Sequence, residues 1–148
     1  MTLAERHRQL IDDLSLIPDR HELLTAIVDR TRRHPPFSTV EKSEAHRVPG
    51  CQSAVWVIGQ RNADGTLDLR CDADSPMVKG LIHLLCEAYT HATPAEIVTT
   101  EPAFLDELGL LRDLSPTRRN GLAAVRNRIK EIAHSALNAS DSSPPGPS

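Results

Sequence analysis

Cys51 is the residue of this chain best placed to do chemistry. It stands in the stretch Gly50-Cys51-Gln52-Ser53, just before a β-branched and aromatic run at 53–58. A glycine allows close backbone approach, so the thiol can lie at the rigid edge of a strand and still be reached. Such a thiol needs a positive neighbour, a helix N-terminus or a partner to become a thiolate at neutral pH. On spacing alone, a buried structural cysteine is the commoner interpretation.

Cys71 and Cys86 bring the total to three cysteines, spaced by 20 and 15 residues without a C-x-x-C pair. Neither a disulfide framework nor a ribbon-type zinc site is therefore indicated. We expect both to be core residues, at a strand end and beside the apolar stripe of a helix. The alternative is a zinc or iron-sulfur scaffold in which Cys51, Cys71 and Cys86 converge on one ion.

Charged side chains gather in two places. Asp72 and Asp74 bracket a predicted helix start, where a solvated, cap-stabilising pair is favoured over an acid-base dyad. Residues 112–130 carry six basic side chains and one acidic one, which form either a solvated helix face or a docking surface for an acidic partner. Within this stretch, Arg126 and Arg128 are expected to be solvent-exposed.

Two histidines invite catalytic or metal interpretations. His46 precedes Cys51 by five residues, but a loop histidine is favoured over a Cys-His protease pair. His83 and Cys86 share one side of a predicted helix, and two ligands without a third are poor grounds for a metal site.

Composition excludes several classes of function. The 148 residues are 39% hydrophobic and 25% charged, which is typical of a globular protein with one core. A net charge of −3 argues against a nucleic-acid or anionic-membrane binder, and 3% aromatic residues argue against a stacking platform for single strands. No apolar run reaches the length of a membrane span, and residues 1–8 are too polar for a signal peptide. We therefore expect a cytoplasmic protein.

Helices are predicted from caps and apolar periodicity. Capping boxes begin at Thr2, Asp19 and Thr93, and Ser75-Pro76 and Ser115-Pro116 each supply an N-cap followed by proline. Pro35 and Pro36 end the second helix. The helix after Ser75 is expected to be the main core element, and the helix after Ser115 keeps an apolar stripe to position 136.

A hairpin is predicted between these helices. The run at 53–58 and the alternating run at 66–69 flank Asp64-Gly65, which tolerates positive φ, and a short strand is added at 45–48. The expected fold is α+β, with a small antiparallel sheet of about three strands packed against several helices in a single domain. The domain is expected to span residues 1–138, followed by a disordered Pro/Ser-rich tail at 139–148.

Four stretches resemble the SufE-type sulfur acceptors, which accompany cysteine desulfurases in iron-sulfur cluster assembly. Residues 48–57 (VPGCQSAVWV) resemble the family's G-C-Q-S-x-V-W signature, and residues 72–81 (DADSPMVKGL) resemble its D-x-D-A-x-I-V-K-G-L helix entry. Residues 93–97 (TPAEI) are similar to T-P-x-x-I, and residues 114–122 (LSPTRRNGL) to L-[ST]-P-[ST]-R-x-x-G-L. The resemblance covers about residues 10–133, in the right order.

This resemblance implies a function. Cys51 would take the outer sulfur of a persulfide on a SufS-like cysteine desulfurase, stimulate that enzyme, and deliver the sulfur to an iron-sulfur scaffold complex. The chain itself would need no metal or cofactor, because the pyridoxal phosphate would belong to the desulfurase. Asp74 and Arg118 match family positions and would contribute to partner binding. The protein would be a monomer or homodimer, and an accessory sulfur-transfer protein rather than an independent enzyme.

The sequence departs from the family pattern next to the second motif. Arg70-Cys71 replaces a small residue and glycine, and Ser75-Pro76 replaces an alanine pair. If Cys71 lay near Cys51, a disulfide between them could release the carried sulfur.

Overall fold

Two amphipathic helices begin the chain. The computed structural model describes residues 1–112 and 114–142, starting with α1 (Leu3–Leu14) and α2 (Arg20–Arg30). The predicted caps are confirmed, because Thr2 Oγ1 accepts from the Glu5 N–H at 3.1 Å and Asp19 Oδ1 from the Glu22 N–H at 3.0 Å. A short 3₁₀ turn, η1 (Thr31–Arg33), ends this unit just before the two prolines.

An antiparallel hairpin follows, made of β1 (Val55–Arg61) and β2 (Leu67–Ala73). Val55 pairs with Ala73 at one end and Arg61 with Leu67 at the other, and Gly65 takes φ +88° in the turn. The third strand expected at 45–48 is reduced to one bridging pair, Arg47 with Trp56. Because this segment makes only two backbone hydrogen bonds to β1, the sheet has two strands in the described part of the chain.

Helix α3 (Pro76–Tyr89) is the main core element, as predicted. It packs on β2 and α2, and nine of its residues are buried. Ser75 precedes it in an extended conformation, but its side chain makes no capping hydrogen bond. Two short helices, α4 (Pro94–Thr99) and α5 (Phe104–Glu107), then lead back across the molecule. In α4 the Glu96 N–H donates to Thr93 Oγ1 at 3.3 Å, which confirms the third capping box.

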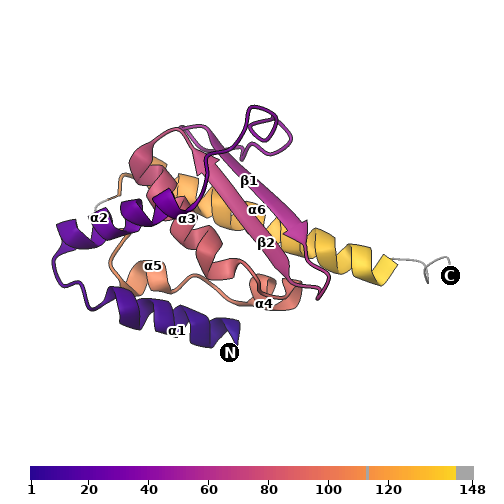
Figure 1. Cartoon of the computed structure of the whole chain (residues 1–148), viewed down its shortest axis with the longest axis horizontal. Coiled ribbons are helices and arrows are strands. Elements are labelled where there is room, and N and C mark those ends of the chain that lie inside the picture. Colours follow the sequence, from indigo (N-terminus) through magenta and orange to yellow (C-terminus); the bar gives the residue numbers. More distant parts are fainter. Residues whose placement is uncertain (113, 143–148) are drawn as a thin grey trace.

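The long helix α6 (Pro116–Ser142) lies along β1 behind the hairpin (Figure 1). A Cβ on Gly59 of β1 would stand 2.5 Å from Ile132 Cγ2, so only glycine permits this close approach. Helix α6 continues four residues into the segment expected to be a disordered tail. The rest of that expectation, at 143–148, lies outside the described residues, as does Asp113 of the basic stretch.

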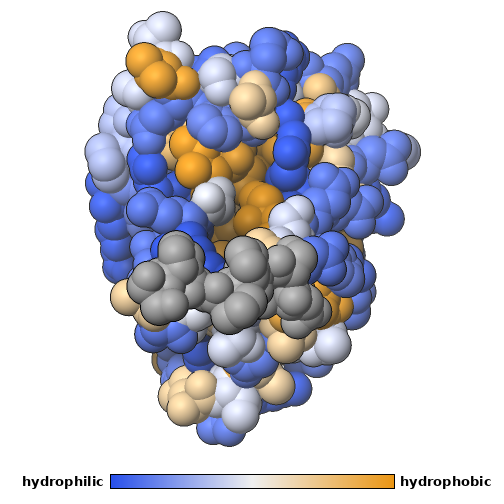
Figure 2. Space-filling model, turned by 90° about the vertical axis from the view of Figure 1, so that its right-hand side faces the viewer, coloured by the Kyte–Doolittle hydropathy of each residue, from blue (hydrophilic) through white to orange (hydrophobic). Residues whose placement is uncertain are grey.

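The architecture confirms the predicted α+β class and a single domain around one core. The face toward the C-terminal end of α6 is mostly hydrophilic, with a hollow near its centre where apolar residues show (Figure 2). No helix among residues 1–112 and 114–142 combines the length and apolar character needed to cross a membrane.

Candidate functional site

Cys51 lies on a loop that rests against the first turns of α6. Its half-buried Sγ donates a hydrogen bond to the backbone carbonyl of Gly121 at 3.5 Å. Gly50 takes φ +87°, a conformation that residues with a side chain rarely adopt. The next residues enter β1, and Val48 on the other side is buried and paired with Val55. The thiol is thus held at the edge of the sheet, as the sequence predicted.

One pocket beside the thiol has a volume of about 480 Å³. It is lined by Cys51 and its neighbours on the loop, by Val78 on α3, and by Ser115, Thr117, Arg118 and Gly121 at the start of α6. The side chain of Ser115 accepts a hydrogen bond from the Arg118 N–H at 3.3 Å and begins the helix. Tertiary structure therefore brings together the predicted residues Cys51 and Arg118, which the sequence separates by 67 positions.

A second pocket, of about 460 Å³, also has Cys51 in its wall. Its charged lining residues are Glu44, Arg47 and Arg128, and the guanidinium of Arg128 donates to the carbonyl of Arg47 at 2.7 Å. Arg128 was expected to be solvated, but it is partly buried against the loop that carries the thiol. Cys51 can thus be approached from two sides.

The protonation state of the thiol follows from its surroundings. Burial raises the pKa of Cys51, and the positive charge of Arg47 opposes that rise without cancelling it. The hydrogen bond to Gly121 also uses the thiol proton, so it favours the neutral form. The free protein therefore holds Cys51 as a neutral thiol, and a reaction as a nucleophile requires that the proton leave.

Asp72 is not part of a solvated pair, which corrects the sequence prediction. It is only 2% exposed, and its carboxylate accepts from the N–H groups of Phe37 and Ala73 and pairs with Lys79 at 3.2 Å. Burial by itself would raise the pKa of Asp72, but these hydrogen bonds and the Lys79 charge outweigh it and lower the pKa. Asp72 therefore ties the loop before β1 to the start of α3.

Asp74 is exposed, as expected, at the same end of the sheet as the thiol loop. Its N–H donates to the carbonyl of Ala54 at 3.1 Å, three residues after Cys51. Its side chain does not line either pocket beside the thiol. Asp74 is thus near Cys51 along the sheet edge, but on the outer surface.

The other two cysteines lie elsewhere, in the core, as predicted. Cys71 is 2% and Cys86 3% exposed, and burial together with the neighbouring Cys86 thiol holds the pKa of Cys71 well above its ordinary value. Both line a separate pocket with His83, whose pKa burial lowers to about 4. No three His, Cys, Asp or Glu side chains of residues 1–112 and 114–142 are grouped to hold a metal ion. The alternative function, a zinc or iron-sulfur scaffold, needs three converging thiols, and Cys51 lies apart from Cys71 and Cys86.

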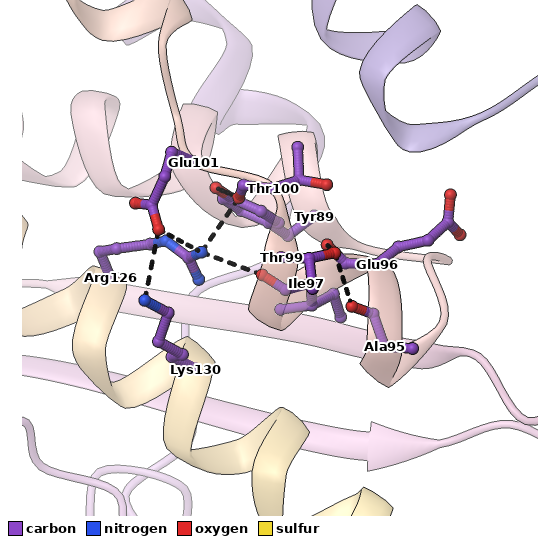
Figure 3. A network of polar contacts seen from close by, with 9 residues as sticks. All are labelled: Tyr89, Ala95, Glu96, Ile97, Thr99, Thr100, Glu101, Arg126 and Lys130. Atoms are coloured by element: carbon purple, nitrogen blue, oxygen red, sulfur yellow. Dashed lines mark hydrogen bonds and ion pairs between the residues drawn. The ribbon is translucent and has the colours of Figure 1, made fainter.

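The expectation that Arg126 is solvated is wrong. Its side chain is 8% exposed, and Nη2 donates to the carbonyls of Ile97 at 2.9 Å and Thr100 at 3.0 Å (Figure 3). The guanidinium carbon lies 4.6 Å from the centre of the Tyr89 ring, and Glu101 is 3.8 Å away at the surface. Arg126 therefore satisfies backbone acceptors at the end of α4 and has a structural position, away from the thiol.

Sequence reasoning missed three residues around Cys51. Arg47, Gly121 and Arg128 had no assigned role at the thiol. Gly121 and Arg128 reach it only through the packing of the loop on α6, and Arg47, four residues before Cys51, acts through its charge. A glycine inside a helix is one available signal, since it costs stability there and often marks a close approach.

Comparison with known proteins gives two findings. The family model described as "SufE: Fe-S metabolism associated domain" matches residues 8–133. The fold is also similar to the solution structure of a hypothetical protein from Thermus thermophilus, with a TM-score of 0.74 and 22% sequence identity. That match covers 90% of this chain and 96% of the other.

Proposed function

This chain belongs to the SufE family, which is associated with iron-sulfur metabolism, and we propose that it accepts sulfur from a cysteine desulfurase on Cys51. It then carries the sulfur as a persulfide and delivers it for iron-sulfur cluster assembly. The family assignment supports the metabolic context, and the geometry around Cys51 supports the choice of the carrier residue.

The observation that carries the proposal is the contrast among the three thiols. Cys51 is half-buried in the wall of two pockets, whereas Cys71 and Cys86 are almost fully buried. A sulfur carrier must meet a sulfur atom on another protein, and only an accessible thiol can do so. Cys51 has that access, with room on both sides for one additional sulfur.

The transfer is an exchange that needs no external oxidant. The Cys51 thiolate attacks the outer sulfur of a persulfide on the desulfurase, and a new S–S bond forms as the old one breaks. The desulfurase cysteine leaves as a thiolate and takes up a proton equivalent to the one that Cys51 lost. Breaking the carbon–sulfur bond of free cysteine is the chemistry of the pyridoxal phosphate in the partner.

Arg118 and Asp74 are the proposed partner contacts. Both are exposed: Arg118 lies in the first turn of α6, and Asp74 in the bend between β2 and α3, which is bonded to Ala54 after the thiol loop. Among the described residues, no carboxylate forms an ion pair with the Arg118 guanidinium, so this group is free to meet an acidic side chain of a partner. A desulfurase docked over both would cover the pocket that opens to Cys51.

Intact-mass measurement tests the proposal. After incubation with a SufS-like desulfurase, pyridoxal phosphate and cysteine, the protein should gain about 32 Da, the mass of one sulfur. Peptide mapping should place that mass on residues 48–57, and dithiothreitol should remove it. A sample without desulfurase is the control. No mass gain in the complete mixture, with an active desulfurase, would contradict the carrier function.

We expect Arg118→Ala to weaken desulfurase binding by at least tenfold, because a desolvated arginine near the centre of an interface is often worth about 2 kcal/mol. Arg119→Ala is the matched control, since Arg119 is the next residue on α6, is exposed, and does not line the pocket. It should change the affinity by less than about 1 kcal/mol. Calorimetric titration measures both, with melting temperatures to verify the fold. Equal affinities of Arg118→Ala and wild type would exclude the docking role.

A further inference from the structure

The loop that carries Cys51 contacts one stripe of α6 at three points. Cys51 donates to the carbonyl of Gly121, Gly50 faces Ala124, and the carbonyl of Arg47 accepts from Arg128. The loop positions decrease from 51 to 47 while the helix positions increase from 121 to 128, so the two segments run antiparallel. Residues 121, 124 and 128 share one helical face, and 121 and 128 are two turns, or about 10.5 Å, apart.

Small residues permit this contact. A Cβ placed on Gly50 would stand 3.8 Å from the Cβ of Ala124, and one placed on Gly121 would stand 3.8 Å from the Cys51 sulfur. The loop backbone therefore lies directly on the helix, with little side-chain volume between them. Weak contacts of this kind hold a segment poorly by themselves, since a thiol-to-carbonyl bond is among the weaker hydrogen bonds.

The strongest of the three contacts is the one made by Arg128. Its guanidinium is a charged donor, and its 2.7 Å bond to the Arg47 carbonyl is short for an N–H to oxygen bond. Arg47 also bridges Trp56 of β1, one residue before the last backbone bond to that strand, which joins Val48 to Val55. The bond therefore joins the entrance of the loop to α6, four residues before the thiol.

We infer that Arg128 is a positioning residue, which seats the Cys51 loop on the face of α6 formed by Gly121 and Ala124 and so keeps the thiol bonded to the Gly121 carbonyl. It acts through the loop backbone and does not touch the sulfur. In the free protein this contact between the loop and α6 keeps the thiol neutral and slow to react. For sulfur transfer, this means that the carrier thiol is held back until a partner engages the loop. That consequence rests on the proposed function.

Arg128 could act on the thiol through its charge or by holding the loop, and the two roles predict opposite changes in the alkylation rate of Cys51 when Arg128 is replaced. The charged groups around Cys51 are Glu44 and Arg47 on the loop side and Arg118 and Arg128 on α6. If Arg128 acted on the thiol by its positive charge, its removal would raise the thiol pKa and slow alkylation. If it holds the loop, its removal lets the thiol leave the Gly121 carbonyl and enter water, and alkylation accelerates.

We expect Arg128→Met to increase the rate of Cys51 alkylation by iodoacetamide on the order of tenfold at pH 7, because a thiol released into water has a lower pKa and is more often a thiolate. Methionine keeps an apolar stem but removes the donor. The rate measured from pH 6 to pH 10 should show the lower pKa, and Arg128→Lys, which restores a charged donor, should recover a rate closer to wild type. Peptide mapping confirms that Cys51 is the residue modified.

Arg61→Ala is the matched control, because Arg61 also donates to a backbone carbonyl of α6, that of Ala136, at the far end of the hairpin. It should leave the alkylation rate unchanged. Ala124→Leu tests the contact between the loop and α6 independently, because it adds volume under Gly50 while Arg128 is kept. It should accelerate alkylation as well. This second variant decides the matter should Arg128→Met fail to fold.

An unchanged or slower rate in folded Arg128→Met, or an unchanged rate in folded Ala124→Leu, would overturn the inference. The measurement uses the free protein without desulfurase. Failure of sulfur loading on Cys51 would therefore contradict the proposed function without affecting this result, and the reverse also holds.

Discussion

Cys51→Ser is expected to abolish sulfur loading completely while the protein remains folded. A serine hydroxyl can donate to the Gly121 carbonyl as the thiol does, so the loop should keep its place on α6. The hydroxyl does not ionise near neutral pH and cannot act as the sulfur nucleophile without a strong base beside it. Intact mass after incubation with desulfurase, pyridoxal phosphate and cysteine should show no addition of about 32 Da.

Cys71→Ala and Cys86→Ala are the matched controls for this experiment. Both sites are buried, so alanine is preferred to serine, which would bury an additional hydroxyl. Each variant should still gain one sulfur, at a cost in stability of about 1 kcal/mol for the lost volume. A sulfur adduct that persists in Cys51→Ser, or disappears in a folded Cys71→Ala or Cys86→Ala protein, would contradict Cys51 as the sole carrier.

Arg126→Ala is expected to destabilise the protein by about 3 kcal/mol, which corresponds to a fall in melting temperature of about 10 °C. The substitution removes a buried side chain that packs on Tyr89, and it leaves the Ile97 carbonyl without its side-chain donor. Thr100 is less affected, because its carbonyl also accepts from the Tyr89 hydroxyl at 2.6 Å (Figure 3). The variant no longer buries a charged group, and this gain offsets part of the lost stability.

Thermal unfolding of Arg126→Ala should be compared with that of Arg119→Ala, an exposed arginine on the same helix. The latter should stay within about 0.5 kcal/mol of wild type. Arg126→Lys should be intermediate, since an ammonium keeps the charge but lacks the planar fork that reaches both carbonyls. Equal stabilities of Arg126→Ala and Arg119→Ala would show that the Arg126 network contributes nothing. Alkylation of Cys51 below the melting transition should be unaffected in all three.

Local signals in the sequence determined most of the elements. The caps at Thr2, Asp19 and Thr93 were predictable because each is a hydrogen bond between residues three apart in the chain. The hairpin was predictable because its strands are joined by a short turn with glycine at the position of positive φ. The third strand was not, since pairing at 46–48 depends on how a loop meets β1 and stops after two hydrogen bonds.

The burial of two charged residues could be found only from the tertiary structure. Asp72 is buried because Phe37, 35 residues away in the chain, and Lys79 on α3 satisfy it. Arg126 is buried because backbone carbonyls more than 25 residues away face it. The sequence shows a charge but not the acceptors that compensate its burial, so exposure was the natural expectation for both.

For the site, the sequence by itself determined the thiol and its place before a strand, since a glycine-cysteine turn and the β-branched run that follows are adjacent in the chain. Only the tertiary structure decided what surrounds that thiol. The Gly121 carbonyl, the Arg118 side chain that lines the pocket, and the Arg128 contact all come from α6, at least 67 residues further along. Their meeting with Cys51 depends on the packing of a loop against a helix, and that packing is fixed by burial across the whole core and by no local pattern.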